Sequence, residues 1–226
     1  MKLGRELIAE TYLKGEGIEI GALHNPLKLP DAAKVKYVDR LSVAELRTQY
    51  PELDSQELVD VDIIADGELL ETIPDASQDF VIANHFIEHC QDPIRALLNM
   101  LRVVKVWGMI YLAIPDKRYS FDIDRPITPL EHIMRDFHEG PEWSRRQHFE
   151  EWVRFVNKVQ DDEEAKKQLD ANMKMNYSIH FHVWTQCEML DLIAALRGMV
   201  NFDIELVLRN ENEVVFILRK DPPTPA

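Results

Sequence analysis

The chain has 226 residues, of which 46% are hydrophobic and 29% charged, the composition of a globular protein. Its formal net charge of -14 argues against nucleic acid as a partner, because phosphate binding needs a basic surface. No run of 18 apolar residues occurs and the N-terminal segment has no signal-peptide centre, so we expect neither a membrane span nor a leader. The isolated Cys90 and Cys187 indicate free thiols in a reducing cytoplasm.

Short strands alternate with helices over the first half of the chain. An amphipathic N-terminal helix is expected, with Leu3, Leu7, Ile8 and Tyr12 on one side. Strands alternating with helices predict a parallel sheet with right-handed crossovers. The expected strands are short apolar segments at residues 17–21, 35–39, 61–67, 80–83 and 109–114.

Two helix starts carry clear capping signals. Ser42 is expected to cap a short helix that places Val43 and Leu46 on one side. Asp92-Pro93 offers an N-cap followed by proline at the first helical position. The apolar stripe of this second helix is Ile94, Leu97, Leu98, Leu101 and Val104.

The C-terminal half predicts a hairpin and an insertion. Residues 203–208 alternate polar and apolar, residues 214–218 are apolar, and the turn-like residues between them indicate an antiparallel hairpin. Helical, charged and aromatic sequence at about 117–200 indicates a lid over the strand ends. We therefore predict one α/β domain, residues 1–220, with a doubly wound seven-stranded sheet. The proline-rich tail, residues 221–226, is expected to be disordered.

The segment ANHFIEHCQDP contains H-x-x-E-H, formed by His85, Glu88 and His89. On a continuous helix this spacing is typical of a zinc metalloprotease. Here the motif directly follows an apolar strand and precedes Asp92-Pro93, where a helix can only begin. The sequence after the motif contains no recognisable third metal ligand. A metal-dependent hydrolase is therefore the least favoured interpretation, and we predict no metal site.

Polar residues and glycine follow four of the five expected parallel strands. In open α/β sheets, ligands bind at the carboxyl ends of the strands. An acid after the second strand suits ribose hydroxyls, and an acid after the third can accept a hydrogen bond from an adenine amine. These strand-end residues are Gly21, Asp39, Asp66, Gly67, Asn84 and His85.

Several of these segments resemble class I S-adenosylmethionine-dependent methyltransferases, over roughly residues 15–118. Residues 80–89, followed by Asp92-Pro93, resemble the fourth-strand segment of that family, and residues 102–108 resemble the turn before its fifth strand. Three further segments resemble a type 11-like bacterial subgroup that is often associated with glycosyltransferases. They are residues 19–26, 37–39 and 114–118.

The resemblance implies a Rossmann-like methyltransferase sheet, S-adenosylmethionine as cofactor and a glycosyltransferase as a partner. It implies that Glu19 and Gly21 lie near the methionine part of the cofactor, Asp39 near the ribose, and Asp66 and Gly67 near the adenine. Asn84 and His85 would flank the sulfonium, and Ala22 and Arg40 are further expected cofactor-binding residues.

The sequence departs from the family pattern in its first loop. That loop keeps only Gly21 of the usual three glycines, and Pro26 and Pro30 stand where a helix normally begins. The first crossover helix must therefore be very short or absent. Trp107 also stands where the family commonly has a glycine.

Methyl transfer is an in-line displacement that requires alignment of the acceptor, and an oxygen acceptor also needs a base. The candidate catalytic residues are His180 and His182, on one face of an extended lid segment, and Asp116 after the fifth strand. Alternatively, the same three residues could act together as the ligands of a metal ion. The alternative is that both histidines only satisfy backbone groups under the lid.

Four arginines could bind an anionic acceptor such as a sugar nucleotide, or could pair with the many acids. They are Arg118, Arg125, Arg145 and Arg146. The function predicted is O-methylation of a small molecule or glycan or nucleotide-sugar precursor. The alternative is a catalytically inactive, methyltransferase-like interaction module.

Overall fold

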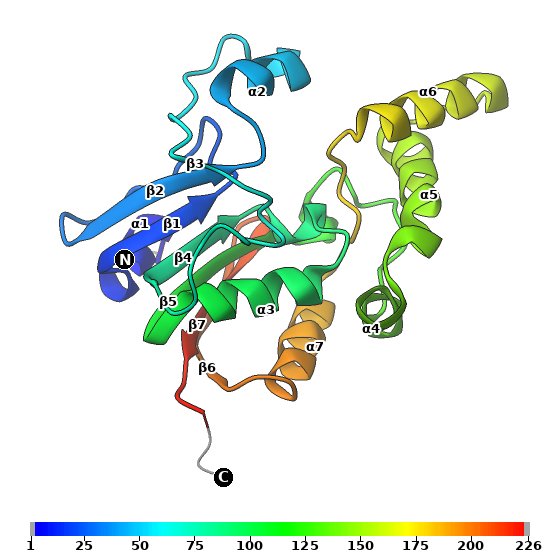
Figure 1. The fold of residues 1–226 in the computed structure, drawn as a ribbon. Coiled ribbons are helices and arrows are strands. Elements are labelled where there is room, and N and C mark those ends of the chain that lie inside the picture. The colour runs from blue at the N-terminus through cyan, green and yellow to red at the C-terminus, as the bar shows by residue number, and fades with distance from the viewer. Residues whose placement is uncertain (1–2, 224–226) are drawn as a thin grey trace.

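A computed structural model describes residues 3–223 and shows one seven-stranded sheet (Figure 1). The strand order is β3-β2-β1-β4-β5-β7-β6, with β1 to β5 parallel and β7 antiparallel to both β5 and β6. This confirms the predicted parallel sheet and its C-terminal hairpin. The strands are β1 (Gly15–Ile20), β2 (Ala33–Asp39), β3 (Ile63–Ile64), β4 (Gln78–Asn84), β5 (Val104–Pro115), β6 (Phe202–Asn210) and β7 (Glu213–Lys220).

The third and fifth strands depart most from the predicted lengths. The third strand is reduced to the two residues of β3. The fifth begins at Val104, which was expected in the preceding helix, because Val104 pairs with Gln78 across an irregular register of β4 and β5. Trp107 lies inside this strand at a φ of 69° and is 60% exposed.

The helices on the sheet are α1 (Arg5–Tyr12), α3 (Pro93–Val103) and α7 (Gln186–Arg197), and α2 (Val43–Gln49) follows β2. Both predicted caps are confirmed: the Ser42 side chain accepts from the Glu45 amide in a capping box, and Asp92 accepts from the Arg95 amide. Helix α1 is present, but Leu3 precedes it and is 46% exposed, so its predicted place on the packed side was wrong.

The strands bury side chains on both faces, as a doubly wound sheet requires. On one face, Ile18, Val81 and Leu112 pack with the apolar stripes of α3 and α7. On the other, Phe80 and Ile82 pack with residues of α1 and β7. The alternation along β4 therefore sets which helix each side chain meets.

The segment between β5 and α7 forms an arm to one side of the sheet (Figure 1). It contains α4 (Leu130–Glu139), α5 (Glu142–Glu151), the π-helical turn η4 (Trp152–Val156) and α6 (Asp162–Met175). The arm has a core of its own, in which Phe149, Leu169 and Phe181 are buried together. The predicted insertion extended to about residue 200, whereas α7 packs on the sheet with the main core.

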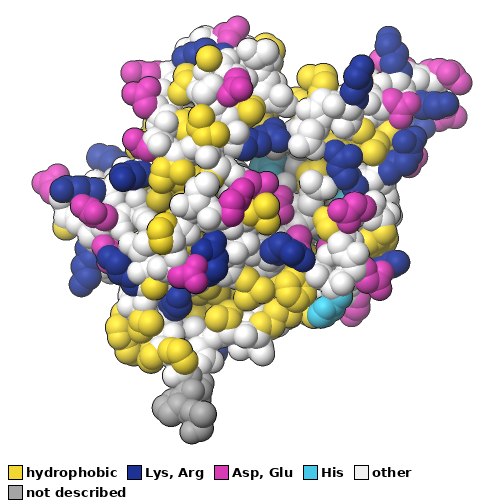
Figure 2. Space-filling view, viewed as in Figure 1, with side chains coloured by type: hydrophobic (Ala, Val, Ile, Leu, Met, Phe, Trp, Pro, Cys, Tyr) yellow, Lys and Arg dark blue, Asp and Glu magenta, His cyan; other side chains and the backbone are white. Residues whose placement is uncertain are grey.

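Figure 2 shows a notch between the surface over α2 and the surface over α5 and α6. Among residues 3–223, no helix combines the length and the apolar character needed to cross a bilayer. The predicted disordered tail includes residues 224–226, which lie outside the described residues.

The cap of α3 gives a test of this packing. We expect Asp92→Ala to lower the free energy of unfolding by about 1–2 kcal/mol, because it removes a buried N-cap at a helix of the main core. Urea unfolding followed by circular dichroism measures the change. The control is Ser42→Ala at the exposed cap of α2, where we expect a smaller loss; an equal loss in both variants would contradict the assignment.

Candidate functional site

The loops at the carboxyl ends of β1 to β5 are joined by backbone hydrogen bonds along one edge of the sheet. The Gly21 amide donates to the Val38 carbonyl at 2.9 Å, and the Ala65 amide donates to the Asp39 carbonyl at 2.9 Å. The His85 amide likewise donates to the carbonyl of Ala113 at 2.8 Å. The structure thus places the strand-end residues predicted from sequence along this one edge.

Two positions at this edge favour glycine for different structural reasons. Gly21 has a φ of 65°, a conformation that other residues rarely adopt, and its nearest neighbour around a Cβ position is Phe86 at 3.9 Å. Gly67 is closely packed instead: a Cβ there would lie 2.6 Å from Ile20 and 2.7 Å from the Phe86 ring. Phe86, not singled out by the sequence analysis, therefore joins the loops after β1, β3 and β4.

The loop after β1 lacks a helix, as predicted, and is held by Glu19. Both carboxylate oxygens of Glu19 accept from the Leu27 amide, at 3.0 and 3.1 Å, and one also accepts from Asn84 Nδ2 at 3.4 Å. Glu19 is 1% exposed, and burial raises its pKa to about 7. Its direct role in this structure is to hold the loop and orient Asn84.

The two strand-end acids lie in local turns at the edge. Asp39 is half-buried and its Oδ1 accepts from the Leu41 amide at 3.3 Å; burial raises the pKa of this carboxyl. Asp66 is exposed and its Oδ1 accepts from the Glu68 amide at 2.8 Å. Arg40 is exposed and donates to the Tyr50 hydroxyl at 3.1 Å, while Ala22 is half-buried beside Gly21.

Asn84 and His85 follow β4 and lie among acidic groups. The Oδ1 atom of Asn84 is buried and has no hydrogen-bond partner among the described residues. His85 has a φ of 48°, and its Nε2 lies 2.9 Å from Glu213 Oε2. Burial lowers the pKa of His85, but the bond to Glu213 and the charges of Glu88 and Glu213 outweigh it and raise the pKa.

Glu213, at the start of β7, is a site residue that no sequence motif signals. Its carboxylate also pairs with Arg5 of α1. Burial opposes ionisation of Glu213, but Arg5 and His85 outweigh it and lower its pKa to about 2. The His85 side chain is therefore held by a carboxylate that stays ionised near neutral pH.

The H-x-x-E-H segment forms only the short 3₁₀ turn η2 (Ile87–His89), as predicted, so the zinc-protease helix is absent. His89 Nδ1 faces the Ile179 carbonyl at 2.9 Å and Ser178 Oγ at 3.0 Å. The Glu88 carbonyl accepts from the amides of Phe181 and His182 at 2.7 and 3.3 Å. The motif therefore attaches the end of β4 to segment 178–182 of the arm.

The Glu88 side chain lies between two imidazoles. It is 1% exposed, and neither carboxylate oxygen has a hydrogen-bond partner among the described residues. Its Oε1 lies 3.6 Å from His85 Nδ1 and 4.0 Å from His180 Nε2. Burial raises the pKa of Glu88.

His180 forms a carboxylate–imidazole pair. Its Nδ1 lies 2.6 Å from Asp122 Oδ2, and Asp122 also accepts from Arg125 at 3.1 Å. The His180 ring centroid lies 4.8 Å from that of Phe121, which is 53% exposed, and 5.9 Å from that of Trp152. Asp122 and Phe121 were missed because they approach His180 only in the folded arm.

The three predicted catalytic residues do not form one site. His182 is 1% exposed and its Nε2 lies 3.7 Å from Asp136, in a group separate from His180. Asp116 is fully buried and pairs with Arg118 at 2.6 Å. The arrangement of both histidines around Asp116 was therefore wrong.

Three of the four arginines follow the second alternative, pairing with acids, and the fourth bonds to an asparagine. Arg118 and Arg125 bond to Asp116 and Asp122, and Arg146 to Asp170 at 3.4 Å. Arg145 donates to Asn176 at 2.9 Å.

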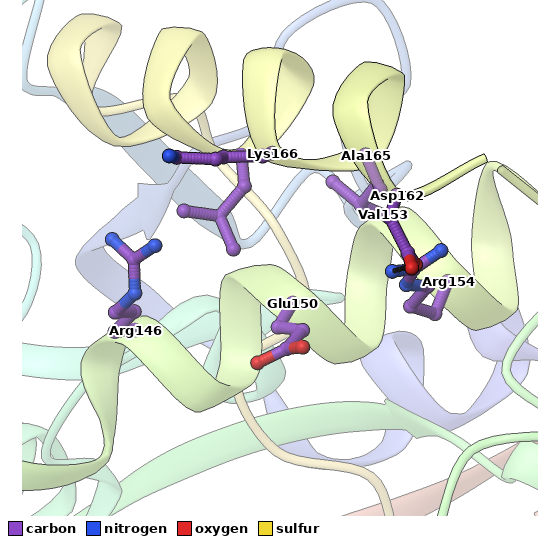
Figure 3. A pocket seen from close by; sticks show the side chains of 8 residues that line it. Arg146, Glu150, Val153, Arg154, Asp162, Ala165 and Lys166 are labelled. Atoms are coloured by element: carbon purple, nitrogen blue, oxygen red, sulfur yellow. Dashed lines mark hydrogen bonds and ion pairs between the residues drawn. The ribbon is translucent and has the colours of Figure 1, made fainter. Parts of the chain in front are cut away.

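A groove between α5 and α6 lies on the arm, away from the strand ends (Figure 3). Its charged lining mixes Arg146, Arg154 and Lys166 with Glu150 and Asp162. Arg154 is already paired with Asp162 across it. The groove has neither the glycines nor the ordered polar groups of the strand-end edge, so we place the candidate site at that edge.

Comparison with known proteins is consistent with this placement. The family model described as a methyltransferase domain matches residues 19–112, which include every predicted cofactor-binding residue. No curated protein sequence matches the chain.

Three solved structures resemble the chain at low identity. A Methanosarcina mazei protein described as a SAM-dependent methyltransferase is 17% identical, with 93% of this chain and 95% of that one covered and a TM-score of 0.50. The Pyrococcus horikoshii protein PH0226 is 15% identical over 92% and 83%, with a TM-score of 0.50. A Rhodobacter sphaeroides protein assigned as a Zn-dependent alcohol dehydrogenase is 15% identical over 93% and 86%, with a TM-score of 0.53.

At these identities the solved structures establish a shared fold only. The family match adds the methyltransferase domain and, with it, S-adenosylmethionine as the cofactor. Residues 19–112 therefore carry a methyltransferase domain, and the chain has the Rossmann-like fold of the class I S-adenosylmethionine-dependent methyltransferases.

Proposed function

We propose that this methyltransferase methylates a hydroxyl oxygen of a small polyhydroxylated acceptor, of the class of glycan or nucleotide-sugar precursors. The observation that carries the proposal is the His180–Asp122 pair at 2.6 Å, beside the exposed ring of Phe121. An oxygen acceptor needs a base, and a carboxylate-held imidazole is suited to that role. An aromatic ring offers an apolar surface to the C–H face of a sugar.

The residues at the strand ends fit S-adenosylmethionine. Gly21 leaves space for close approach to its backbone, and Asp39 and Asp66 offer acceptors for hydroxyl and amine donors. The unpartnered Oδ1 of Asn84 and the carboxylates around His85 suit a cationic sulfonium. The cofactor supplies, when bound, an electrophilic methyl group on a positively charged sulfur. The residues that we propose to hold it are Gly21, Ala22, Asp39, Arg40, Asp66, Gly67, Asn84 and His85, with Glu19 acting through Asn84.

His180 would serve as the base. Its Nδ1 faces Asp122, so a proton on that nitrogen is held by the carboxylate and Nε2 is left to accept the acceptor's proton. Asp122 would then stabilise the imidazolium. Nε2 of His180 and Nδ1 of His85 both lie within 4.0 Å of Glu88 Oε1, which puts the base next to the proposed reactive end of the cofactor site.

The other two candidates take different roles in this proposal. Asp116 is fully buried against Arg118, so we assign it the positioning of the loop after β5. His182 donates its amide to the Glu88 carbonyl at 3.3 Å, while its imidazole faces the arm. Neither side chain is required to contact the acceptor.

One observation favours the alternative, a non-catalytic interaction module. The Leu27 amide occupies both oxygens of Glu19, and the loop after β1 lacks the crossover helix. In that case the chain would bind the cofactor without turnover on any sugar acceptor. For either function, the partner we propose is a glycosyltransferase, on the subgroup resemblance.

Calorimetric titration with S-adenosylhomocysteine tests the cofactor site. We expect the wild type to bind and Asp39→Asn to bind at least ~10-fold more weakly, because a hydrogen bond to a charged group contributes about 1.5–3 kcal/mol. The control is Asp60→Asn, which removes the same charge from an exposed loop. No binding to the folded wild type would refute the proposed site, and equal affinity of Asp39→Asn would remove Asp39 from it.

Transfer of a radiolabelled methyl group to a panel of sugars and nucleotide sugars tests the base. We expect His180→Ala to reduce kcat by about 10²–10⁴-fold, the usual contribution of a general base, with unchanged affinity for S-adenosylhomocysteine. His138→Ala, at an exposed position of α4, is the matched control. Full turnover by His180→Ala would exclude this role, and cofactor binding without turnover on any acceptor would favour the interaction module.

A further inference from the structure

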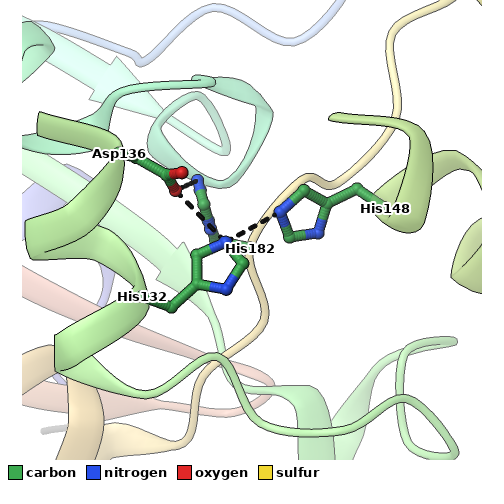
Figure 4. A group of neighbouring side chains, drawn as sticks. All are labelled: His132, Asp136, His148 and His182. Atoms are coloured by element: carbon green, nitrogen blue, oxygen red, sulfur yellow. Dashed lines mark hydrogen bonds and ion pairs between the residues drawn. The ribbon is translucent and has the colours of Figure 1, made fainter. Parts of the chain in front are cut away.

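A second group of histidines lies inside the arm, apart from the strand ends (Figure 4). His132 and Asp136 are one turn apart on α4, His148 comes from α5, and His182 comes from the segment between α6 and α7. Each residue offers one ligand atom, and these four atoms lie within 4.8 Å of one another. Three separate parts of the arm therefore meet at these four side chains.

The spacing of the donor atoms matches the coordination sphere of a small metal ion. His132 Nε2 lies 3.1 Å from His148 Nε2 and 3.2 Å from Asp136 Oδ2. His182 Nε2 lies 3.7 Å from the same Asp136 oxygen and 3.3 Å from the Gln91 carbonyl, a contact that a metal bound at Nε2 would replace. Bonds of about 2.0–2.1 Å in a tetrahedron separate neighbouring ligand atoms by roughly 3.3 Å.

The carboxylate of this group has only imidazoles, and no arginine or lysine, within ion-pair distance among the described residues. Asp136 is fully buried, and its Oδ2 has no hydrogen-bond partner of good geometry among the described residues. Neutral imidazoles are the form that binds metals, whereas a buried, unpaired carboxylate is costly without a cation.

Surrounding residues hold the four side chains in place. Ser144 Oγ donates to the other oxygen of Asp136 at 3.1 Å. The Trp184 ring stacks on His182, with centroids 5.6 Å apart and an angle of 19° between the planes. The Trp143 ring lies against His132 at 4.6 Å. These contacts restrict the orientation of Asp136, His182 and His132.

We propose that His132, Asp136, His148 and His182 bind one divalent metal ion, and that zinc is the ion the donor set selects. Three imidazoles and one carboxylate suit zinc better than magnesium or calcium, which prefer oxygen ligands. Four protein ligands close the coordination sphere, and three of them are at least nine-tenths buried, so the site is structural. It would fasten α4, α5 and the His182 segment to one another, and so position His180 two residues away.

Another group of three residues, Glu88, His89 and His180, also has ligand atoms close enough together to hold a metal ion. That group, however, offers only three ligand atoms, one fewer than a closed structural zinc site needs. Its carboxylate also lies 4.0 Å from His180, instead of converging with it on one point. The proposal is therefore confined to the group in the arm.

The experiment uses the full chain, stripped with a chelator and then incubated with zinc chloride before gel filtration. We expect about one zinc per chain by elemental analysis, and a midpoint of thermal unfolding that rises when zinc is restored, because the ion binds only the folded state. Wild-type protein that retains no stoichiometric zinc and gains no thermal stability would overturn the proposal.

The zinc content of variants that lack a proposed ligand tests where the ion binds. We expect His148→Ala and Asp136→Asn to retain less than about a tenth of the wild-type zinc after gel filtration, because each removes one of four ligands. His138→Ala, on the same helix as Asp136, and His180→Ala are the controls and should retain it. Full zinc content in folded His148→Ala and Asp136→Asn would place the ion elsewhere and refute the assignment.

A spectroscopic measurement on the wild type avoids dependence on variant folding. Cobalt(II) substituted for zinc should give the intense visible absorption of a tetrahedral site, and zinc should displace it. The weak absorption of octahedral cobalt would contradict the four-ligand site. Neither the metal content nor this spectrum depends on methyl transfer. These measurements therefore test the metal site independently of the proposed function.

Discussion

Glu88 links the arm to the end of β4, beside the apolar packing of Ile133 of α4 in the main core. Its carbonyl accepts from two successive amides of the arm, those of Phe181 and His182, while its buried side chain lies between His85 and His180. A buried carboxylate is tolerated only where surrounding groups compensate for lost hydration. The same residue therefore contributes both to the attachment of the arm and to the polar environment at the end of β4.

The segment of residues 178–182 divides the arm into two chemically different sides. His180 faces Asp122 and the strand-end loop, next to the partly exposed Phe121. His182 faces Asp136 and two further imidazoles inside the arm. In the proposals made above, one side binds the acceptor and the other holds a metal that keeps the segment in place. Rigidity on the second side would support alignment on the first, which in-line methyl transfer requires.

The first loop shows how a methyltransferase fold can be kept without its usual glycine pattern. Glu19 accepts from the Leu27 amide, so a side chain fixes a loop that a crossover helix would otherwise fix. The loop keeps glycine only at Gly21, where the positive φ requires it. The backbone at the edge is thus still open to a ligand, although the helix N-terminus that commonly faces a cofactor is missing.

The sequence by itself determined the sheet, its hairpin and the placement of polar residues at the strand ends. These follow from local information: apolar runs, the Asp92-Pro93 cap and the strand-to-helix spacing that excluded a zinc-protease helix around His85. Only the tertiary structure decided how the arm uses its side chains. His132, His148 and His182 are far apart in sequence and share no motif, and Asp122 meets His180 across 58 residues. Such contacts depend on how helices pack in space, so neither periodicity nor spacing along the chain could predict them.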